Sequence, residues 1–509
     1  MLKWIDDLLN RFTMYRLLLY FLLGLLGVAF VFCFFHILPF SPYALLFSTF
    51  FITTVCWITN EICAKLWKAP TNIESVYITA LMLALLIAPI AASTDTTFFA
   101  LATWASIWSM ASKYIFAIGK KHLFNPAAFA IALTSIAINQ SANWWVGTAW
   151  MLPFVLVGGL LLVRKIRRFD LVVSFFAVAM VSIVVSGIIR GVPLFRLVST
   201  TLVETPIFFF AFVMLTEPLT TPPTKTLRLI YGAVVGLLFA PWVHVGSFYS
   251  TPEIALVLGN IFSYLVSPKA KFVMNLKEQI TVADHTSDFL FEPSQELKYR
   301  PGQYMEWTLE HERPDRRGNR RYFTLASSPT EKDLRIGVKF YPDGSSFKHA
   351  LSGMVSTDVI VGAQLAGDFV LPINVTKKLV FIAGGIGVTP FRSMIKYLVD
   401  RHEPRDIVLF YSNKTPADIA YRDVFDAAKD ELGIKTIYAL TDKATVPAGW
   451  TGKVGYVDAK MIAEEVPDFA DREFFISGPH GMVTAFQKTL KGMGVPASRI
   501  KTDFFPGFA

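Results

Sequence analysis

LVFIAGGIGVTPFRSMIKYL, the stretch from residue 379 to residue 398, predicts a strand, a glycine turn and a helix in direct succession. The apolar run Leu379–Ala383 is typical of a buried strand, and the spacing of apolar residues after Pro390 predicts an amphipathic helix that ends near Arg401. Glycines between the two allow a tight turn and a close approach of the backbone to a pyrophosphate at the helix N-terminus. Alone, this turn is a moderate signal, because any tight strand–helix connection favours glycine.

The strand signal recurs on the C-terminal side of this turn, with helical segments in between, at 407–411, 435–440 and 473–477. This alternation predicts a doubly wound parallel α/β domain over residues 376–509. Over residues 269–375, apolar and polar residues instead alternate in short runs bounded by Pro, Gly and Asp. That pattern predicts an antiparallel β-barrel domain.

The N-terminal half has a different composition. Hydrophobic residues make up 53% of the chain and charged residues 17%, fewer charges than a soluble protein usually carries, and nearly all of the apolar excess lies before Pro268. We therefore expect residues 1–268 to form a polytopic α-helical membrane bundle of about ten spans. The apolar runs lie at 17–37, 43–62, 75–92, 97–118, 126–138, 146–163, 171–189, 198–215, 227–243 and 252–266. The short run 126–138 and the run that holds Pro206 are candidates for broken helices, which tend to frame binding sites.

The charges in the loops predict the orientation. With the N-terminus inside, the inner segments hold sixteen Lys and Arg residues and the outer loops hold Arg190 and Arg196, a strong positive-inside bias. An even number of spans returns the chain to the cytoplasm at Pro268. We expect a multi-pass protein of the cell (inner) membrane with its N-terminus and its C-terminal domains in the cytoplasm. The net charge of +9 is then explained by the basic residues of the inner loops, and no nucleic-acid partner is expected. Run 17–37 is long enough to be a membrane span, and we do not expect it to be a cleaved signal peptide.

Cysteine and histidine counts limit the metal cofactors. The three cysteines lack the spacing of an iron–sulfur cluster and are interpreted as small apolar helix residues; they are Cys33, Cys56 and Cys63. The apolar half has three histidines, fewer than the stacked pairs that a two-haem reductase needs; they are His36, His122 and His244. No metal site is expected, and a single haem at the outer side stays an alternative.

Four further motifs accompany the glycine turn in a fixed order. They are Arg321-Tyr322-Phe323-Thr324, Gly337-Val338-Lys339, Gly344-Ser345-Ser346 and, after the turn, Ser477-Gly478-Pro479. Each alone is more often an ordinary strand or turn, but the ordered set resembles the ferredoxin–NADP reductase superfamily from about Phe272 to Ala509. The resemblance implies an FAD-binding barrel followed by an NAD(P)-binding α/β domain, with hydride transfer from NAD(P)H to FAD.

The resemblance also implies roles on the flavin side. Arg321 would meet the flavin pyrophosphate, which a guanidinium binds with two hydrogen bonds. Phe323 stands where the family has Tyr and would stack on the cofactor, while Thr324 would contact the isoalloxazine ring. Backbone amides near the serine pair would meet the FAD phosphates. The rest of the FAD site would comprise Tyr322, Val338, Lys339, Gly344, Ser345 and Ser346.

On the nicotinamide side, the dinucleotide would lie on the turn formed by Gly384, Gly385, Gly387, Val388, Thr389 and Pro390. Ser477, with Gly478 and Pro479, stands where the family has a cysteine near the transferred hydride, so Ser477 and Thr324 are the candidate catalytic residues. The adenosine ribose would lie at the strand end formed by Ser412, Asn413 and Lys414. Lys414 fits either a 2′-phosphate or a solvated loop, which leaves NADH and NADPH open. Phe504 and Phe508 would cover the flavin or belong to a final strand.

Two patterns stand out in the membrane half, Asn125-Pro126 and Thr216-Glu217-Pro218. Helix capping and helix termination explain them as well as function does. Over about Leu17–Ser267 they resemble the membrane flavin-binding subunits of the sodium-translocating NADH:quinone reductase and Rnf complexes. The resemblance implies a flavin near both motifs. Residues 138–151, INQSANWWVGTAWM, lack the family's Ser-x-Ala-Thr motif for covalent FMN. The alternatives are a second, non-covalent flavin (FMN or riboflavin) and no flavin in the membrane half.

These features predict an NAD(P)H-dependent membrane flavoprotein oxidoreductase. Electrons would pass from NAD(P)H through FAD to a cofactor in the membrane domain, and on to a quinone or an extracytoplasmic acceptor. The alternatives are a haem-linked transmembrane ferric or oxygen reductase and a component of a redox-driven ion pump. Glu204 is the acidic residue deep in an apolar run that an ion pump could use, although an interfacial position is the simpler interpretation. The sequence leaves partner subunits open.

Overall fold

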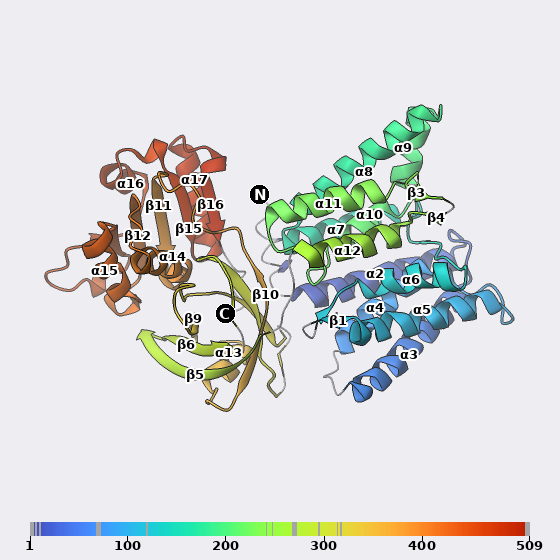
Figure 1. Cartoon of the computed structure of the whole chain (residues 1–509), viewed down its shortest axis with the longest axis horizontal. Coiled ribbons are helices and arrows are strands. Elements are labelled where there is room, and N and C mark those ends of the chain that lie inside the picture. Colours follow the sequence, from blue (N-terminus) through green and yellow to red (C-terminus); the bar gives the residue numbers. More distant parts are fainter. Residues whose placement is uncertain are drawn as a thin grey trace. The chain divides into compact units, whose positions relative to one another are not determined.

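In the computed structural model the chain divides into two compact units, unit 1 at Met1–Ala270 and unit 2 at Lys271–Ala509 (Figure 1). The division into three domains at 1–268, 269–375 and 376–509 stays a prediction. The structure describes residues 5, 8–9, 12–67, 73–118, 121–240, 242–246, 248–266, 272–293, 296–312, 314–315 and 318–503.

Unit 1 is helical. Its helices are α2 (Met14–Phe34), α3 (Pro42–Leu66), α4 (Ile73–Leu86), α5 (Thr96–Ile115), α6 (Pro126–Ala137), α7 (Leu152–Ile166), α8 (Phe169–Ile189), α9 (Leu194–Val203), α10 (Ile207–Phe209), the π-helix η1 (Phe210–Met214), α11 (Lys225–Leu238) and α12 (Pro252–Val266). Two short hairpins join them, β1 (Ala117–Ile118) with β2 (Lys121–His122), and β3 (His244–Val245) with β4 (Phe248–Tyr249).

Three described helices of unit 1 are long and apolar enough to cross a membrane, namely α2, α3 and α8. A fourth candidate is the pair α9 and α10–η1, which is bent by 56°. The bend lies at Pro206, which has no N–H to donate to the preceding turn. Helices α4, α6 and α12 are apolar but shorter. The total of about ten spans stays a prediction.

The surface of unit 1 fits a lipid environment. Large apolar side chains such as Phe50 and Phe195 are exposed, whereas Asn60, Ser106 and Ser109 are buried between helices. Small and polar residues inside with apolar residues outside are typical of helices that pack in a membrane. Exposed aromatic rings of this size are unfavourable in water and favourable against lipid.

Unit 2 begins with a six-stranded antiparallel sheet in the order β8-β7-β10-β5-β6-β9. The strands are β5 (Phe272–Ala283), β6 (Thr286–Pro293), β7 (Tyr304–Thr308), β8 (Arg320–Thr324), β9 (Leu334–Lys339) and β10 (Val359–Ala366), with α13 (Ser346–Ser352) between β9 and β10. Beyond the end of β8, the Ala326 amide donates to the Arg335 carbonyl of β9 over 2.8 Å. This contact joins the two edge strands at one point, and complete closure into a barrel stays a prediction.

A six-stranded parallel sheet follows in the order β14-β13-β12-β11-β15-β16. Its strands are β11 (Leu379–Gly384), β12 (Ile407–Asn413), β13 (Lys435–Leu440), β14 (Lys453–Val454), β15 (Glu473–Ser477) and β16 (Ile500–Asp503). Alternate residues of β11 face opposite cores: Phe381 packs with α14 (Thr389–Asp400) and α15 (Arg422–Leu432), while Ile382 packs with α16 (Ala459–Glu465) and α17 (His480–Gly492). Helices therefore cover both faces, and the predicted doubly wound α/β sheet is confirmed.

Candidate active site

The glycine turn lies at the carboxyl ends of two adjacent parallel strands. Residues Gly385–Val388 form a 3-10 turn between β11 and α14, and Ala383 of β11 pairs with Ser477 of β15. A Cβ on Gly387 would lie 2.5 Å from the Cα of Gly478, and one on Gly384 would lie 2.2 Å from the sulfur of Met482. The turn and the segment after β15 therefore touch backbone to backbone, which only glycine permits at residue 387.

The next glycine of the turn has the opposite surroundings. Gly385 has φ +51°, and a Cβ built on it would meet no atom within 4 Å. The carboxyl ends of parallel strands are where open α/β sheets bind their ligands. A turn that is packed on one side and open on the other fits the close approach of a dinucleotide backbone.

The flavin-side motif is brought together around one buried ring. Arg321 and Phe323 lie two residues apart on β8 and so face the same side of the strand. The Arg321 guanidinium lies 5.3 Å from the Phe347 ring centroid, and the Phe323 ring lies 6.0 Å from it. Ser345 caps α13 by accepting from the Lys348 amide. Strand β8 and helix α13, which Ser345 caps, are separate in sequence and pack together around Phe347.

The remaining residues of this motif point elsewhere. The Tyr322 hydroxyl donates to Glu306 Oε2 over 2.8 Å, on the opposite face of β8 from Arg321. Thr324 shares that opposite face and is 5% exposed. Val338 is buried in the antiparallel sheet, and the Lys339 ammonium lies 2.5 Å from Asp418 Oδ1. The structure therefore places Lys339 in an ion pair with the parallel-sheet lobe.

Helix α14 connects the glycine turn to the flavin strand. The Arg392 guanidinium donates to the Ala326 carbonyl over 2.7 Å and to both oxygens of Glu331 over 2.7 and 3.0 Å, and the Ser393 hydroxyl donates to the Ser327 carbonyl over 2.6 Å. Ala326 follows Thr324 by two residues, and Arg392 follows Thr389 by three. The two halves of the predicted site are thus bonded together within unit 2.

Electrostatics hold this connection ionised. Burial by itself would raise the pKa of Glu331, but the hydrogen bonds and charge of Arg392 outweigh it and hold that pKa below its usual range. Burial opposes the charge of Arg392 in the same way, and Glu331 raises the pKa of the guanidinium. A buried ion pair that is bidentate fixes the relative positions of its two partners well.

The predicted ribose site lies at the end of β12. Asn413 is 4% exposed, and neither atom of its side-chain amide has a hydrogen-bond partner among the described residues. Ser412 is half-buried and Lys414 is exposed, and the Asp442 amide donates to the Lys414 carbonyl. A buried amide without a partner normally indicates a missing ligand or water, which fits a sugar hydroxyl.

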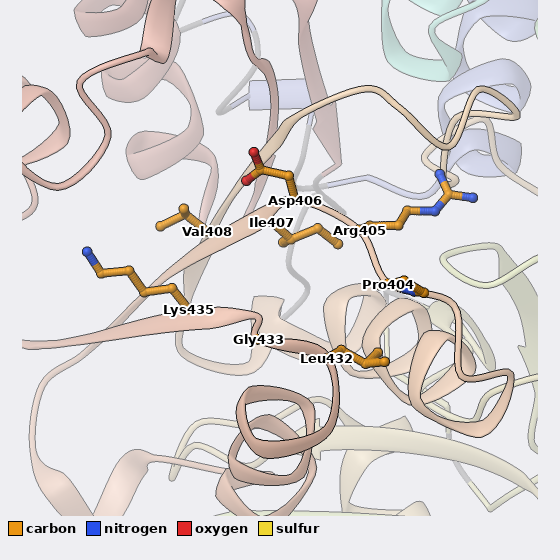
Figure 2. Close-up of a pocket in the computed structure, with 8 residues that line it drawn as sticks. All are labelled: Pro404, Arg405, Asp406, Ile407, Val408, Leu432, Gly433 and Lys435. Carbon is orange, nitrogen blue, oxygen red and sulfur yellow. The ribbon is translucent and has the colours of Figure 1, made fainter.

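A pocket elsewhere in the sheet does not belong to this site. Figure 2 shows it at the amino ends of β12 and β13, opposite the edge that carries the glycine turn. Its charged groups already have partners: Asp406 accepts from Arg472 over 2.6 Å, and Lys435 donates to Glu465 over 2.7 Å. We assign no ligand to it.

The sequence interpretation missed the charged residues behind the site. Asp288 on β6 is fully buried, accepts from the Tyr421 hydroxyl over 2.5 Å and lies 2.7 Å from Arg335. A carboxylate directly before the apolar run Phe289-Leu290-Phe291 was the available signal, because an acid inside a buried strand needs a partner. The predicted aromatics Phe504 and Phe508 lie outside the described residues.

The membrane-half motifs form a polar network within unit 1. Asn125 caps α6, with Pro126 in its first turn, and its side-chain amide donates to Glu217 Oε2 over 3.0 Å. His122 Nε2 lies 3.3 Å from Glu217 Oε1, and the Asn125 backbone amide donates to the Asn260 side chain over 2.8 Å. The capping interpretation thus holds for Asn125, and the same side chain also joins the two motifs.

The other motif residues flank this network. Thr216 donates to the Phe212 carbonyl one turn earlier, and Pro218 follows Glu217 where the helical segment ends. Among the described residues, no group of three His, Cys, Asp or Glu side chains could hold a metal ion.

Both halves of the chain match known families. The description "Oxidoreductase NAD-binding domain" matches residues 381–488, and the "NQR2, RnfD, RnfE family" matches residues 145–271. NADH-cytochrome b5 reductase 1 of Ajellomyces capsulatus is 30% identical over 252 residues, which cover 46% of this chain and 80% of that protein. The glycine betaine monooxygenase reductase subunit of Pseudomonas aeruginosa is 28% identical over 213 residues, 41% of this chain and 56% of that protein.

Among solved structures, the cytochrome b5 reductase domain of Ulva prolifera nitrate reductase is similar, with 21% identity and a TM-score of 0.39 over 45% of this chain and 96% of that domain. The sequence relatives establish FAD and NAD(P)H as the cofactors of the C-terminal half. The chain belongs through its C-terminal half to the ferredoxin–NADP reductase-like NAD(P)H-dependent FAD oxidoreductases, and residues 145–271 of its N-terminal half match the NQR2, RnfD, RnfE family.

Proposed function

We propose that this protein takes electrons from NADH and passes them through FAD to a carrier in its own membrane domain. The observation that carries the proposal is the bonded connection between the glycine turn and the flavin strand, through Arg392 and Ala326. It lies in a chain that also contains a membrane domain of a redox-complex family. A reductase module alone would need no such domain.

In this site Arg321 holds the FAD pyrophosphate, and the Ser345 amide binds the phosphate beside it. The Ser346 amide already donates to Asp315 Oδ2 over 3.0 Å, so the predicted phosphate contact of Ser346 is not kept. Phe323 packs on the cofactor from the same face of β8. FAD, when bound, accepts a hydride, which is two electrons with one proton, and releases electrons one at a time. Ser477 is the hydroxyl group that borders the reacting rings. Thr324 takes no part in this proposal, because it is buried on the opposite face of β8 from Phe323.

The nucleotide lies on the turn Gly384–Pro390, with its pyrophosphate at the N-terminus of α14 and its ribose against Asn413. We propose NADH as the preferred donor. The loop after β13, whose Asp442 amide donates to the Lys414 carbonyl, carries the carboxylate of Asp442, which repels a 2′-phosphate. Relatives that bear NADH in their names are similar over this half.

The second stage takes place in the membrane domain. We propose a non-covalent flavin, FMN or riboflavin, near Asn125, Pro126, Thr216, Glu217 and Pro218, because a hydrocarbon core about 30 Å thick requires an intermediate carrier. From there electrons pass to a quinone or an extracytoplasmic acceptor. The bias of Lys and Arg toward the inner loops supports a multi-pass protein of the cell membrane with its N-terminus and its C-terminal domains in the cytoplasm.

The first stage is tested by adding NADH, and separately NADPH, to the purified full-length protein without oxygen and following the flavin spectrum. Reduction by NADH that is faster than reduction by NADPH is expected. FAD-loaded protein that neither nucleotide reduces would overturn the first stage.

The second stage is tested by extracting the cofactors for mass spectrometry. FAD together with FMN or riboflavin is expected, and FAD alone overturns the membrane flavin. Sealed vesicles supplied with NADH on the cytoplasmic side should reduce a quinone or an acceptor on the opposite side. Their failure to do so overturns electron delivery through the membrane domain.

A further inference from the structure

Behind the glycine turn lies a polar contact to which the proposed function assigns no role. Asp288 of the antiparallel sheet is fully buried, and its Oδ1 accepts from the hydroxyl of Tyr421, which precedes α15 in the parallel-sheet lobe. The distance is 2.5 Å. Arg335, on β9, donates to the other carboxylate oxygen over 2.7 Å. One carboxylate therefore ties a strand of the flavin lobe to a loop of the nucleotide lobe.

The contact lies directly beside the nucleotide turn. A Cβ on Gly337 would meet the Tyr421 hydroxyl oxygen at 2.3 Å, the methyl carbon of Thr389 at 2.9 Å and Asp288 Oδ1 at 3.1 Å. Thr389 is the first residue of α14 and follows the glycine turn without a gap. Asp288, Tyr421 and Thr389 thus converge on a residue of β9 that has no side chain.

The protonation states favour a fixed geometry. Burial raises the pKa of Tyr421 well above its usual range, and the neighbouring Asp288 raises it further, so its hydroxyl stays protonated and donates. Burial also raises the pKa of Asp288, while Tyr421 and Arg335 oppose that shift. Arg392 lies over the Tyr421 ring, 5.4 Å from its centroid, and adds a second contact to this side chain.

Tyr421 also has an unusual backbone. Its φ is +58°, in the left-handed region that non-glycine residues rarely adopt. Such a conformation persists only where its surroundings hold it, and it is most frequent at functional sites. The side-chain contacts to Asp288 and Arg392 provide that restraint.

We propose that Asp288 and Tyr421 are positioning residues for hydride transfer, an inference that rests on the proposed function of this site. They hold Thr389, and with it the nucleotide turn, at a fixed distance from β9 of the flavin lobe. Neither residue touches the reacting rings. Their effect is on the distance between donor and acceptor, to which transfer rates are steeply sensitive.

The test is Tyr421→Phe in the full-length protein loaded with FAD, which removes one hydroxyl and keeps the ring. Flavin reduction at saturating NADH should slow about tenfold. The isotope effect with NADH deuterated at the transferred position should rise, while the FAD content matches that of Tyr397→Phe. Tyr397 is a half-buried tyrosine packed against the same core, and its variant is the matched control.

Gly337→Ala provides an independent variant, since it keeps every hydrogen-bonding group and displaces Tyr421 or Thr389 by steric contact. It should reproduce the slower transfer and the larger isotope effect. Wild-type rates in both variants would overturn the proposal, as would a rate loss no larger than the loss of FAD with an unchanged isotope effect. A wild-type protein that holds FAD but is not reduced by NADH contradicts the proposed function itself, which separates the two failures.

Discussion

Each half of the chain buries a carboxylate that gathers hydrogen bonds from several elements, but the partners differ in charge. In unit 2, Asp288 is fully buried and lies 2.7 Å from the permanent charge of Arg335. In unit 1, the side chain of Glu217 is 18% exposed and is held by His122, Asn125 and Thr220, none of which carries a permanent charge.

This difference in the charge of the partners determines how each site responds when its carboxylate is replaced. A fully desolvated carboxylate that lost its charge would leave the guanidinium beside it without an ion-pair partner. The groups that donate to Glu217 could also donate to the side-chain oxygen of a glutamine, and the Glu217 side chain is partly exposed to solvent. We call each of these carboxylates, together with the groups that donate to it, a hub. The hub in unit 2 contains a permanently charged partner, whereas the hub in unit 1 is held by side chains without a permanent charge.

Asp288→Ala should have the largest effect. It leaves Arg335 and the Tyr421 hydroxyl without their acceptor, and the free energy of unfolding of unit 2 should fall by about 3–5 kcal/mol. The loss of unfolding free energy is measured by urea unfolding, with the release of flavin as the signal. Asp284→Ala, at an exposed aspartate just before β6, is the control and should change stability by less than about 0.5 kcal/mol. Equal losses in the two variants would contradict the assignment of Asp288 as a hub.

Gly387→Ala should affect catalysis more than stability. Its Cβ would lie 2.5 Å from the Gly478 backbone, so the turn and the segment after β15 must separate, and flavin reduction by NADH should slow about a hundredfold. Stopped-flow reduction at saturating NADH measures it. Gly492→Ala adds a Cβ that meets no atom within 4 Å and should leave the rate unchanged. A normal rate in Gly387→Ala would argue against nucleotide binding at this turn.

Glu217→Gln should cost only about 1 kcal/mol, because the amide keeps one acceptor and its size is unchanged. The thermal midpoint in detergent measures this change, with Glu204→Gln, at an exposed glutamate, as the matched control. The same variant should lower the content of extracted FMN or riboflavin without changing the FAD content. A stability loss as large as that of Asp288→Ala would remove the contrast between the two hubs.

Asp468→Asn should have the smallest effect. Hydrogen bonds from Arg472 and Lys378 lower the pKa of Asp468 from 3.8 to about 2. Because the folded-state pKa is depressed, the contribution to stability is present above pH 3.8 and is lost as the pH falls toward about 2. The site is partly exposed, so the difference from wild type at neutral pH should stay below about 1 kcal/mol. Unfolding free energies measured against pH should converge at the acid end, and a constant difference would contradict the expected titration.

The element types were predictable because their signals are local. The runs at 407–411, 435–440 and 473–477 match β12, β13 and β15, and the bend near Pro206 follows from the missing N–H of that residue. Asn125 was equally well explained by capping or by function, and the structure shows capping with an additional bond to Glu217.

The candidate site was predictable as a set of motifs and not as a set of contacts. Arg321 and Phe323 lie two residues apart, so strand periodicity already placed them on one face. Both side chains contact Phe347 because of the way α13 packs against β8. Lys339 pairs with Asp418 because of the way the β12–α15 connection packs. No pattern within a short window of sequence encodes those distances.

Periodicity, glycine placement and apolar run length were thus enough to separate a membrane half from a reductase half, because each depends on neighbouring residues along the chain. The hydrogen bond between Asp288 and Tyr421 joins residues 133 positions apart. It exists only because two sheets with different strand orders pack against one another and exclude water from a carboxylate, which then needs a partner. The pairing of Asp288 with Tyr421 therefore depends on burial, and burial is a property of the folded molecule.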